Sequence, residues 1–249
     1  MVSAIGLIAC GTKAPSTDAE KLARGRELVQ QMSAKLAVAN AIIVTTTEVR
    51  DKVRLSGKKE PLSMTSVYTV KRPNSFYAKM TGGRGLESWY NGKTLTIASH
   101  PHKVFAQAPM PDTIDQALDA LAERYDMPLP MGDLFYSSAE KALLSDTTTG
   151  GYAGIEKVGD VSCTHLAFHD TGVDWDLWLP EQGDPLPKRF KVVQTGRTAQ
   201  PVIDVTFTAW NLAPQMDAAT FKPKVPADYE GIAVLQRAAA VKKNVGVAK

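Results

Sequence analysis

The fold is indicated first by a short run of β-forming residues around an Asn-Gly pair, Trp89-Tyr90-Asn91-Gly92-Lys93-Thr94-Leu95. Asn-Gly accepts the positive φ angles of a type I′ turn, and the aromatic and β-branched residues on both sides favour strands. The stretch therefore predicts a β-hairpin. A further turn at residues 99–102 continues the hairpin into a strand at residues 104–106.

Strands are predicted on both sides of this hairpin. Upstream, a period of two is carried by the apolar residues Leu62, Met64, Tyr68, Val70, Phe76, Ala78 and Met80. Downstream, strands are predicted around residues 152–157, 161–168, 173–179, 188–194 and 202–210, separated by turns that contain glycine.

Three segments have the character of helices. Thr17-Asp18-Ala19-Glu20 has the spacing of a capping box, and apolar residues recur behind it at helical spacing up to Ala39. Residues 113–125 predict a second helix. The more apolar segment 131–144 predicts a third helix. The order is helix, about six strands, two helices, about five strands. Because no strand–helix–strand alternation occurs, the class is α+β with an antiparallel sheet.

Length and charge restrict the function further. The chain has 249 residues and a net charge of +3, and part of that excess lies at the C-terminal end. We expect one domain over residues 17–235 and a flexible basic tail over 236–249. Basic residues form no stripe with interleaved aromatics, so no nucleic-acid partner is expected.

The N-terminal residues resemble a secretion signal. An apolar run over residues 2–9 is too short to span a bilayer. Leu7-Ile8-Ala9-Cys10 resembles the bacterial lipobox, which implies a signal sequence over residues 1–10, lipidation of Cys10 and a tether over 11–16. No Lys or Arg precedes the run, so either the true start lies upstream or the signal is weak. Gly11 follows the cysteine at the position where an Asp would favour retention in the inner membrane. By this rule, the resemblance implies that the protein is located at the outer membrane.

Residues capable of chemistry do not form a recognisable site. His165 and His169 lie four apart on a predicted strand, about 13 Å from each other, too far to share a metal. Asp174 and Asp176 flank Trp175, and we expect that tryptophan to face inward and the two acids to face solvent. No catalytic motif occurs. We therefore expect no catalytic residue, metal or cofactor, and no enzyme.

Several stretches resemble the DUF2092 family of periplasmic proteins and lipoproteins, whose members look like the lipoprotein carriers LolA and LolB. They are residues 89–95, 113–119, 163–168, 173–175 and 210–214, and the ending 221–226 also resembles pieces of the carriers. The resemblance implies a strongly curved, unclosed half-barrel of about eleven strands with helices covering its concave face. In the carriers, that face binds acyl chains of a lipoprotein in transit.

A ligand site follows as an expectation from this shape. We expect an apolar cavity lined by aromatic residues at inward strand positions, namely Tyr68, Phe76, Tyr90, Trp175 and Phe207. We expect the segment 131–144 to act as a lid, with Met131, Leu134, Phe135 and Tyr136 repacking when a chain enters. The alternative is that these side chains fill the core and leave no room for a ligand.

Two functions are thus open. The first is a lipid-anchored periplasmic protein that holds an acyl chain or another hydrophobic ligand, with a role in lipoprotein or lipid handling. The second is a module that binds an envelope protein or senses envelope stress, without a small ligand.

Overall fold

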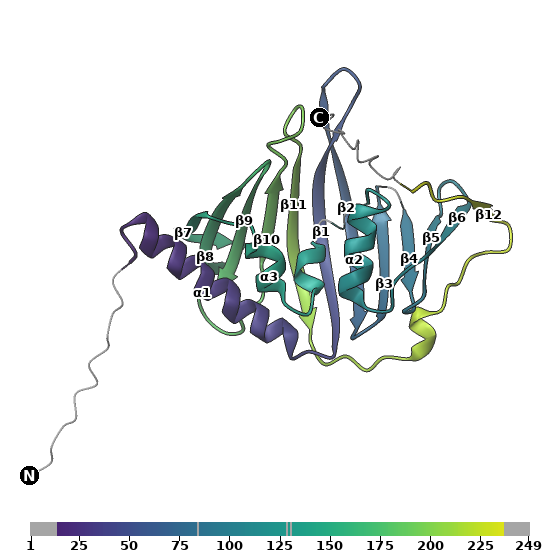
Figure 1. The fold of residues 1–249 in the computed structure, drawn as a ribbon, viewed down its shortest axis with the longest axis horizontal. Helices are drawn as coiled ribbons and strands as arrows, with labels where there is room; N and C mark the ends of the chain where they lie inside the picture. The colour runs from purple at the N-terminus through teal and green to yellow at the C-terminus, as the bar shows by residue number, and fades with distance from the viewer. Residues whose placement is uncertain (1–13, 84, 128, 130, 237–249) are drawn as a thin grey trace, which may run out of the picture.

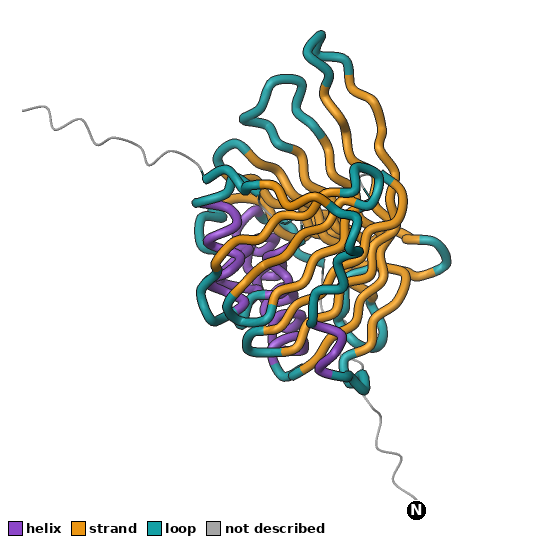
Figure 2. The backbone as a smooth tube through the Cα atoms, turned by 90° about the vertical axis from the view of Figure 1, so that its right-hand side faces the viewer, coloured by secondary structure: helices purple, strands orange, loops and turns teal. Residues whose placement is uncertain are grey.

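The computed structural model describes residues 14–83, 85–127, 129 and 131–236. These residues form one curved sheet of twelve strands with helices on its concave face (Figures 1 and 2). The predicted lipidation site Cys10, residues 11–13 of the predicted tether and residues 237–249 of the predicted tail lie outside the described residues.

Two meanders make up the sheet. The first comprises β1 (Ala41–Val53), β2 (Lys59–Lys71), β3 (Ser75–Gly82), β4 (Leu86–Tyr90), β5 (Thr94–Ser99) and β6 (Val104–Pro109). The second comprises β7 (Thr149–Val158), β8 (Val161–Asp170), β9 (Val173–Pro180), β10 (Arg189–Val193) and β11 (Val202–Asn211). They are joined at the centre, where β1 pairs with β11 in antiparallel fashion. The α+β class and the unclosed, curved sheet are confirmed.

One strand corrects the predicted purely antiparallel sheet. β12 (Glu230–Ile232) pairs in parallel with β6 and forms one edge of the sheet. The sheet is therefore mixed, with twelve strands among the described residues rather than about eleven. A strand of three residues is too short to show a periodic pattern in the sequence. Its pairing depends instead on main-chain hydrogen bonds at the available edge of β6.

The predicted hairpin is confirmed, but its turn is different. Residues 91–93 connect β4 and β5, and only Gly92 has a positive φ, of 83°. The side-chain Oδ1 of Asn91 accepts hydrogen bonds from the amides of Lys93 and Thr94. Asn91 thus closes the turn through its side chain, and the type I′ prediction is wrong because that turn needs positive φ at both central residues.

The first helix, α1 (Asp18–Ala37), begins as predicted. The hydroxyl of Thr17 accepts from the amide of Glu20, and the Glu20 carboxylate accepts from the Thr17 amide. These hydrogen bonds from Ser16 and Thr17 lower the pKa of Glu20 to about 2. The buried face of α1 contains Gly25, Val29, Met32, Ser33 and Leu36 and lies over the second meander (Figure 1).

The segment between the two meanders contributes the remaining cover. It contains α2 (Ile114–Glu123), a short 3-10 helix η1 (Gly132–Phe135) and α3 (Ala139–Leu144). A second 3-10 helix, η2 (Ala218–Phe221), follows the last long strand. Figure 2 shows the sheet bent around the helices, so that the core lies between them and the concave face.

Candidate functional site

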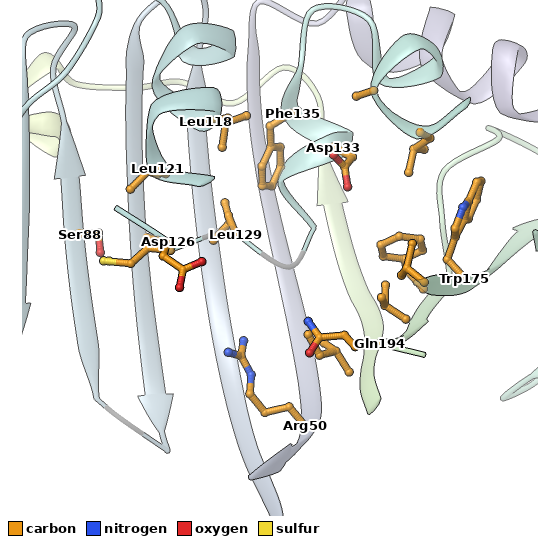
Figure 3. Close-up of a pocket in the computed structure, with 18 of the residues that line it drawn as sticks. Arg50, Ser88, Leu118, Leu121, Asp126, Leu129, Asp133, Phe135, Trp175 and Gln194 are labelled. Carbon is orange, nitrogen blue, oxygen red and sulfur yellow. The ribbon is translucent and has the colours of Figure 1, made fainter. Parts of the chain in front are cut away.

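The helices do not fill the hollow of the sheet. A cavity of about 1330 Å³ lies between them and the concave face (Figure 3). Pockets that hold small ligands usually occupy about 300–1,000 Å³, so this space is large enough for an extended molecule.

The cavity has a wall of strands and a roof of helices. Its strand wall on the side of the first meander includes Phe76, Ala78, Ser88, Tyr90, Leu95 and Ile97. On the other side, Trp175, Phe190, Val192 and Ile203 continue it. The roof is formed by Leu118 and Leu121 of α2, by Phe135 of η1 and by Leu143 of α3. Apolar side chains from four parts of the chain thus enclose one space.

The structure brings several of the predicted cavity residues together. Phe76, Tyr90 and Trp175 lie in the strand wall, and Phe135 of the predicted lid lies above them. The indole N–H of Trp175 donates to Asp170 at 2.9 Å, and its ring stacks on Phe168. These contacts fix the tryptophan at one end of the cavity.

The other two predicted strand residues, Tyr68 and Phe207, are buried in the core and are not exposed to the cavity. Tyr68 is fully buried, with its ring 6.2 Å from Phe76 and 5.8 Å from Phe135 between centroids. Phe207 is buried against Trp210. Neither residue is part of the cavity lining. The alternation of apolar and polar residues along a strand identifies which side chains face inward. It does not show which of these inward side chains a covering helix will bury completely.

The predicted lid segment occupies part of the hollow. Met131 and Leu134 are fully buried in the core and do not line the cavity. Tyr136 is half-buried, and its hydroxyl donates to Asp119 of α2 at 2.7 Å. The guanidinium of Arg72 donates to the carbonyl oxygens of Phe135 and Tyr136, at 2.9 and 3.0 Å. In this structure the segment is therefore held both to α2 and to the sheet.

Three ionisable groups, Asp133 and Tyr90 in the cavity lining and Tyr68 in the core beside it, have shifted pKa values because their surroundings are poorly solvated. Burial raises the pKa of Asp133, on η1, to about 6. Burial, together with the nearby Asp112 carboxylate, raises the pKa of Tyr90 to about 12. Burial raises the pKa of Tyr68 to about 12, and the Glu48 carboxylate adds to this rise. Burial thus disfavours the charged forms of Asp133 and Tyr90 at this site.

Charged residues at the cavity were missed by the sequence reasoning, and Arg50 with its partner Glu48 is the best-defined example. Arg50 of β1 lines the cavity, and its Nε donates to the buried Glu48 carboxylate at 2.6 Å. Figure 3 shows Arg50 on the strand side of the cavity, opposite the helices. The signal was the alternation of β1 itself, since both residues share the inward face with Val44.

The histidines and acids considered for chemistry lie elsewhere. His165 contacts Asp176 at 2.8 Å and stacks on Trp178, and His169 contacts Asp174 at 3.1 Å. None of these five residues lines the cavity. Within the part of the chain that the structure describes, no three His, Cys, Asp or Glu residues gather as a metal site would require. Among the same residues, no helix has the length and apolarity to cross a bilayer.

Comparison with known proteins identifies a family. The family model described as "Predicted periplasmic protein (DUF2092)" matches residues 25–235. No curated protein matches the sequence.

Solved structures with a similar fold share little sequence with this chain. An uncharacterised conserved protein from Thermus thermophilus has 10% identity and a TM-score of 0.49, over 84% of this chain and 98% of that one. The lipoprotein LppX from Mycobacterium tuberculosis has 12% identity and a TM-score of 0.46, over 77% and 98%. A LolA superfamily protein from Nitrosomonas europaea has 11% identity and a TM-score of 0.35, over 80% and 98%. At such identities the likeness concerns the fold alone.

Proposed function

Because the chain belongs to the DUF2092 family of predicted periplasmic proteins, we propose that it is a periplasmic binding protein for an acyl chain or another hydrophobic ligand. The ligand would lie in the cavity between the helices and the concave face of the sheet. No covalent step is part of this proposal, and no residue set at the cavity suggests one.

The observation that carries the proposal is the unfilled apolar volume of about 1330 Å³. The space is a partly open pocket between the helices and the sheet, and its size suits an extended ligand that enters from solvent. Transfer of a hydrocarbon chain from water into the cavity is favourable by roughly 25 cal/mol per Å² of apolar surface buried. Most of the lining surface is apolar, which favours a ligand with a hydrocarbon part.

A membrane anchor is the second part of the proposal. Cleavage before Cys10 and acylation of that residue would tether the domain to a membrane, which we propose is the outer membrane, facing the periplasm. A tethered protein suits the receipt or retention of a ligand better than shuttling between membranes. The anchor is tested by labelling cells with radioactive palmitate: the chain should carry label and the Cys10→Ser variant should carry none.

Ligand binding is tested by extracting lipids from the full chain, carrying Cys10→Ser, after purification from the periplasm. Mass spectrometry should find an acyl-containing molecule in near-stoichiometric amount. Leu121→Trp fills the cavity from α2 and should reduce that amount at least tenfold. Val49→Trp places the same bulk on the opposite face of the sheet, at an exposed position, and should leave it unchanged.

The outcome also separates the two functions considered from the sequence. Absence of any lipid in extracts, together with failure to load added lipids, would contradict the binding proposal. Recovery of one stoichiometric envelope protein by crosslinking, with no ligand in the cavity, would favour a protein-interaction module instead.

A further inference from the structure

One carboxylate faces the cavity from its roof. Asp133 belongs to η1, and the other three residues of that turn, Gly132, Leu134 and Phe135, are buried. Asp133 itself lines the cavity. Figure 3 shows its side chain between Phe135 and Trp175, with the carboxylate pointing from η1 into the open space. A ligand in the cavity can therefore contact this group directly.

The Asp133 carboxylate lacks a counter-charge in the described part of the chain. Burial raises its pKa to about 6, its own backbone amide lowers it, and no charged neighbour contributes. Its oxygens are not among the sealed atoms of the core, unlike Glu48 Oε2. At about pH 7 the group is therefore ionised, accessible from the cavity and uncompensated. A charge in poorly solvated surroundings is costly unless it is paired, so a ligand that supplies the partner is favoured.

The cations that line the cavity belong to its strand side. Arg50 and Lys52 are on β1, and Arg197 is in the loop between β10 and β11. Arg50 is already paired with Glu48. Among the described residues of the cover, 110–148, no Lys or Arg lines the cavity. The roof around Asp133 therefore has no positive charge of its own.

Aromatic rings surround the same space. Phe76, Tyr90, Phe135, Trp175 and Phe190 all line the cavity. The faces of aromatic rings attract cations, and this attraction grows where water is excluded. A carboxylate among aromatic side chains is thus suited to a positively charged group attached to a hydrocarbon chain. The rings contact the chain as well as the cation, whereas the carboxylate distinguishes the charge of the ligand.

We propose that Asp133 binds the protonated amine of a cationic amphiphile whose hydrocarbon chain occupies the apolar part of the cavity. This inference rests on the proposed function and names the ligand class: a long-chain amine, rather than a plain hydrocarbon, an alcohol or a fatty acid anion. The ammonium N–H groups donate to the oxygens of Asp133, and the rings of Phe135 and Trp175 lie on either side of the contact (Figure 3).

The charge of Asp133 decides between the possible head groups. An alkyl ammonium group has a pKa close to that of lysine, about 10.4, so it is positive at the pH where Asp133 is negative. A hydrogen bond between opposite charges is stronger than one between a charged and a neutral group. An alcohol can donate to Asp133 but brings no charge. A fatty acid anion brings a like charge and is disfavoured.

Three probes with the same hydrocarbon chain test this selectivity: oleylamine, oleyl alcohol and oleate. Their affinities for the full chain with Cys10→Ser are measured at about pH 7.5, by displacement of a fluorescent lipid. The quantity of interest is the ratio of amine affinity to alcohol affinity, compared between the chain with and without Asp133→Asn. This comparison cancels differences in the solubility of the probes. We expect Asp133→Asn to lower the ratio about tenfold, the effect of one charge-assisted hydrogen bond.

A matched control separates contact from net charge. Asp133→Asn keeps the size of the side chain and removes its charge, and it should fold at least as well as the wild type because burial opposes that charge. Glu123→Gln removes the same charge from an exposed position at the end of α2, outside the cavity lining. The control should keep the wild-type ratio. An equal fall in both variants would contradict a contact at Asp133.

Oleate provides a second readout of opposite sign. Asp133→Asn removes the like charge that opposes this anion, so the variant should bind oleate more tightly than the wild type does, relative to oleyl alcohol. An unchanged amine-to-alcohol ratio in Asp133→Asn would overturn the amine subsite, and so would unchanged oleate binding. If the wild-type chain binds none of the three lipids, the proposed function itself is overturned, whereas binding that ignores Asp133 overturns the subsite alone.

Discussion

The helices α1 and α2 cover two parts of the same concave face, but they approach it differently. α1 contacts the sheet backbone to backbone: a Cβ on Gly25 would lie 2.6 Å from the Cα of Gly151 on β7. α2 instead presents Leu118 and Leu121 to the cavity. Within the described residues, α1 contributes nothing to the cavity lining. Small residues thus seal one end of the hollow, while large apolar side chains leave the other end open.

Polar contacts reinforce this difference. α1 is joined to the loop before β7 by Arg26, which donates to the carbonyl of Thr147, and to α3 by Ser33, which accepts from the amide of Glu140. α2 is joined mainly to its neighbour in the cover: Asp115 accepts from Ser137 and Asp119 from Tyr136. α1 is thus tied both to the β7 end of the sheet and to α3, whereas these contacts tie α2 to the neighbouring part of the cover above the cavity.

The largest expected effect comes from breaking the sealed end. In Gly151→Ala, the added Cβ would meet the carbonyl oxygen of Lys21 at 2.1 Å, and the backbone has a φ of +121°. We expect a loss of about 4 kcal/mol or more in the free energy of unfolding, measured by chemical denaturation. The control Gly154→Ala also has a positive φ but open space around it, and it should cost only about 1–2 kcal/mol. Equal losses would show that α1 does not need the close contact.

Truncation of one leucine on each side compares the packing under α1 with the packing under α2. Leu166→Ala removes a fully buried side chain from β8 and should lower the free energy of unfolding by about 3 kcal/mol. Leu121→Ala enlarges a space that already exists, so it should cost less than about 1.5 kcal/mol. Thermal and denaturant unfolding measure both. A loss at Leu121 as large as that at Leu166 would mean that the α2 side is packed as tightly as the α1 side.

A third effect depends on pH and concerns Asp133 at the cavity. Its pKa rises from 3.8 to about 6 on folding, so the folded state holds the proton more strongly than the unfolded state. Stability should therefore fall as pH rises from about 4 to 6, and the cost then stays constant. Asp133→Asn does not titrate and should exceed the wild type by about 1–2 kcal/mol above pH 6, with the difference vanishing below pH 4. Unfolding curves across this range measure it, and a difference independent of pH would contradict the assignment.

The smallest effect compares the two helix caps. Thr17 and Thr113 each accept from the backbone amide of the third residue of their helix. Thr17→Ala and Thr113→Ala should each cost about 1 kcal/mol. Only Thr113→Ala should also weaken lipid binding, because only α2 borders the cavity. Weakened binding in Thr17→Ala would link the sealed end to the ligand site.

Much of the fold was predictable because it depends on local patterns. The capping box at Thr17 and the Asn-Gly pair are short local signals, and both mark the elements they predicted, although the turn of the hairpin is not type I′. The strands of the second meander follow from alternation between glycine-containing turns. The parallel pairing of β12 has no local signal, since the partner, β6, lies more than one hundred residues away in the sequence.

The site was predictable only in part. Alternation placed Phe76, Tyr90 and Trp175 on the inward face, and in the structure these three residues line the cavity. It could not show that Tyr68 and Phe207 would be sealed, because depth depends on where the helices lie. Glu48 was missed for a different reason: a glutamate in a strand is normally assigned to the solvent side, and only the three-dimensional pairing with Arg50 accounts for its burial.

The central pairing of β1 with β11 also sets the order of events during synthesis. Residues 41–53 emerge early, but their partner strand, residues 202–211, emerges near the end of the chain. Pairings this distant in sequence form slowly, on the order of milliseconds to seconds. Until then, one edge of β1 stays bare on a nascent polypeptide, where it can attract other strands. The unpaired edge of β1 is therefore the place where wrong strand pairing can begin before β11 is available.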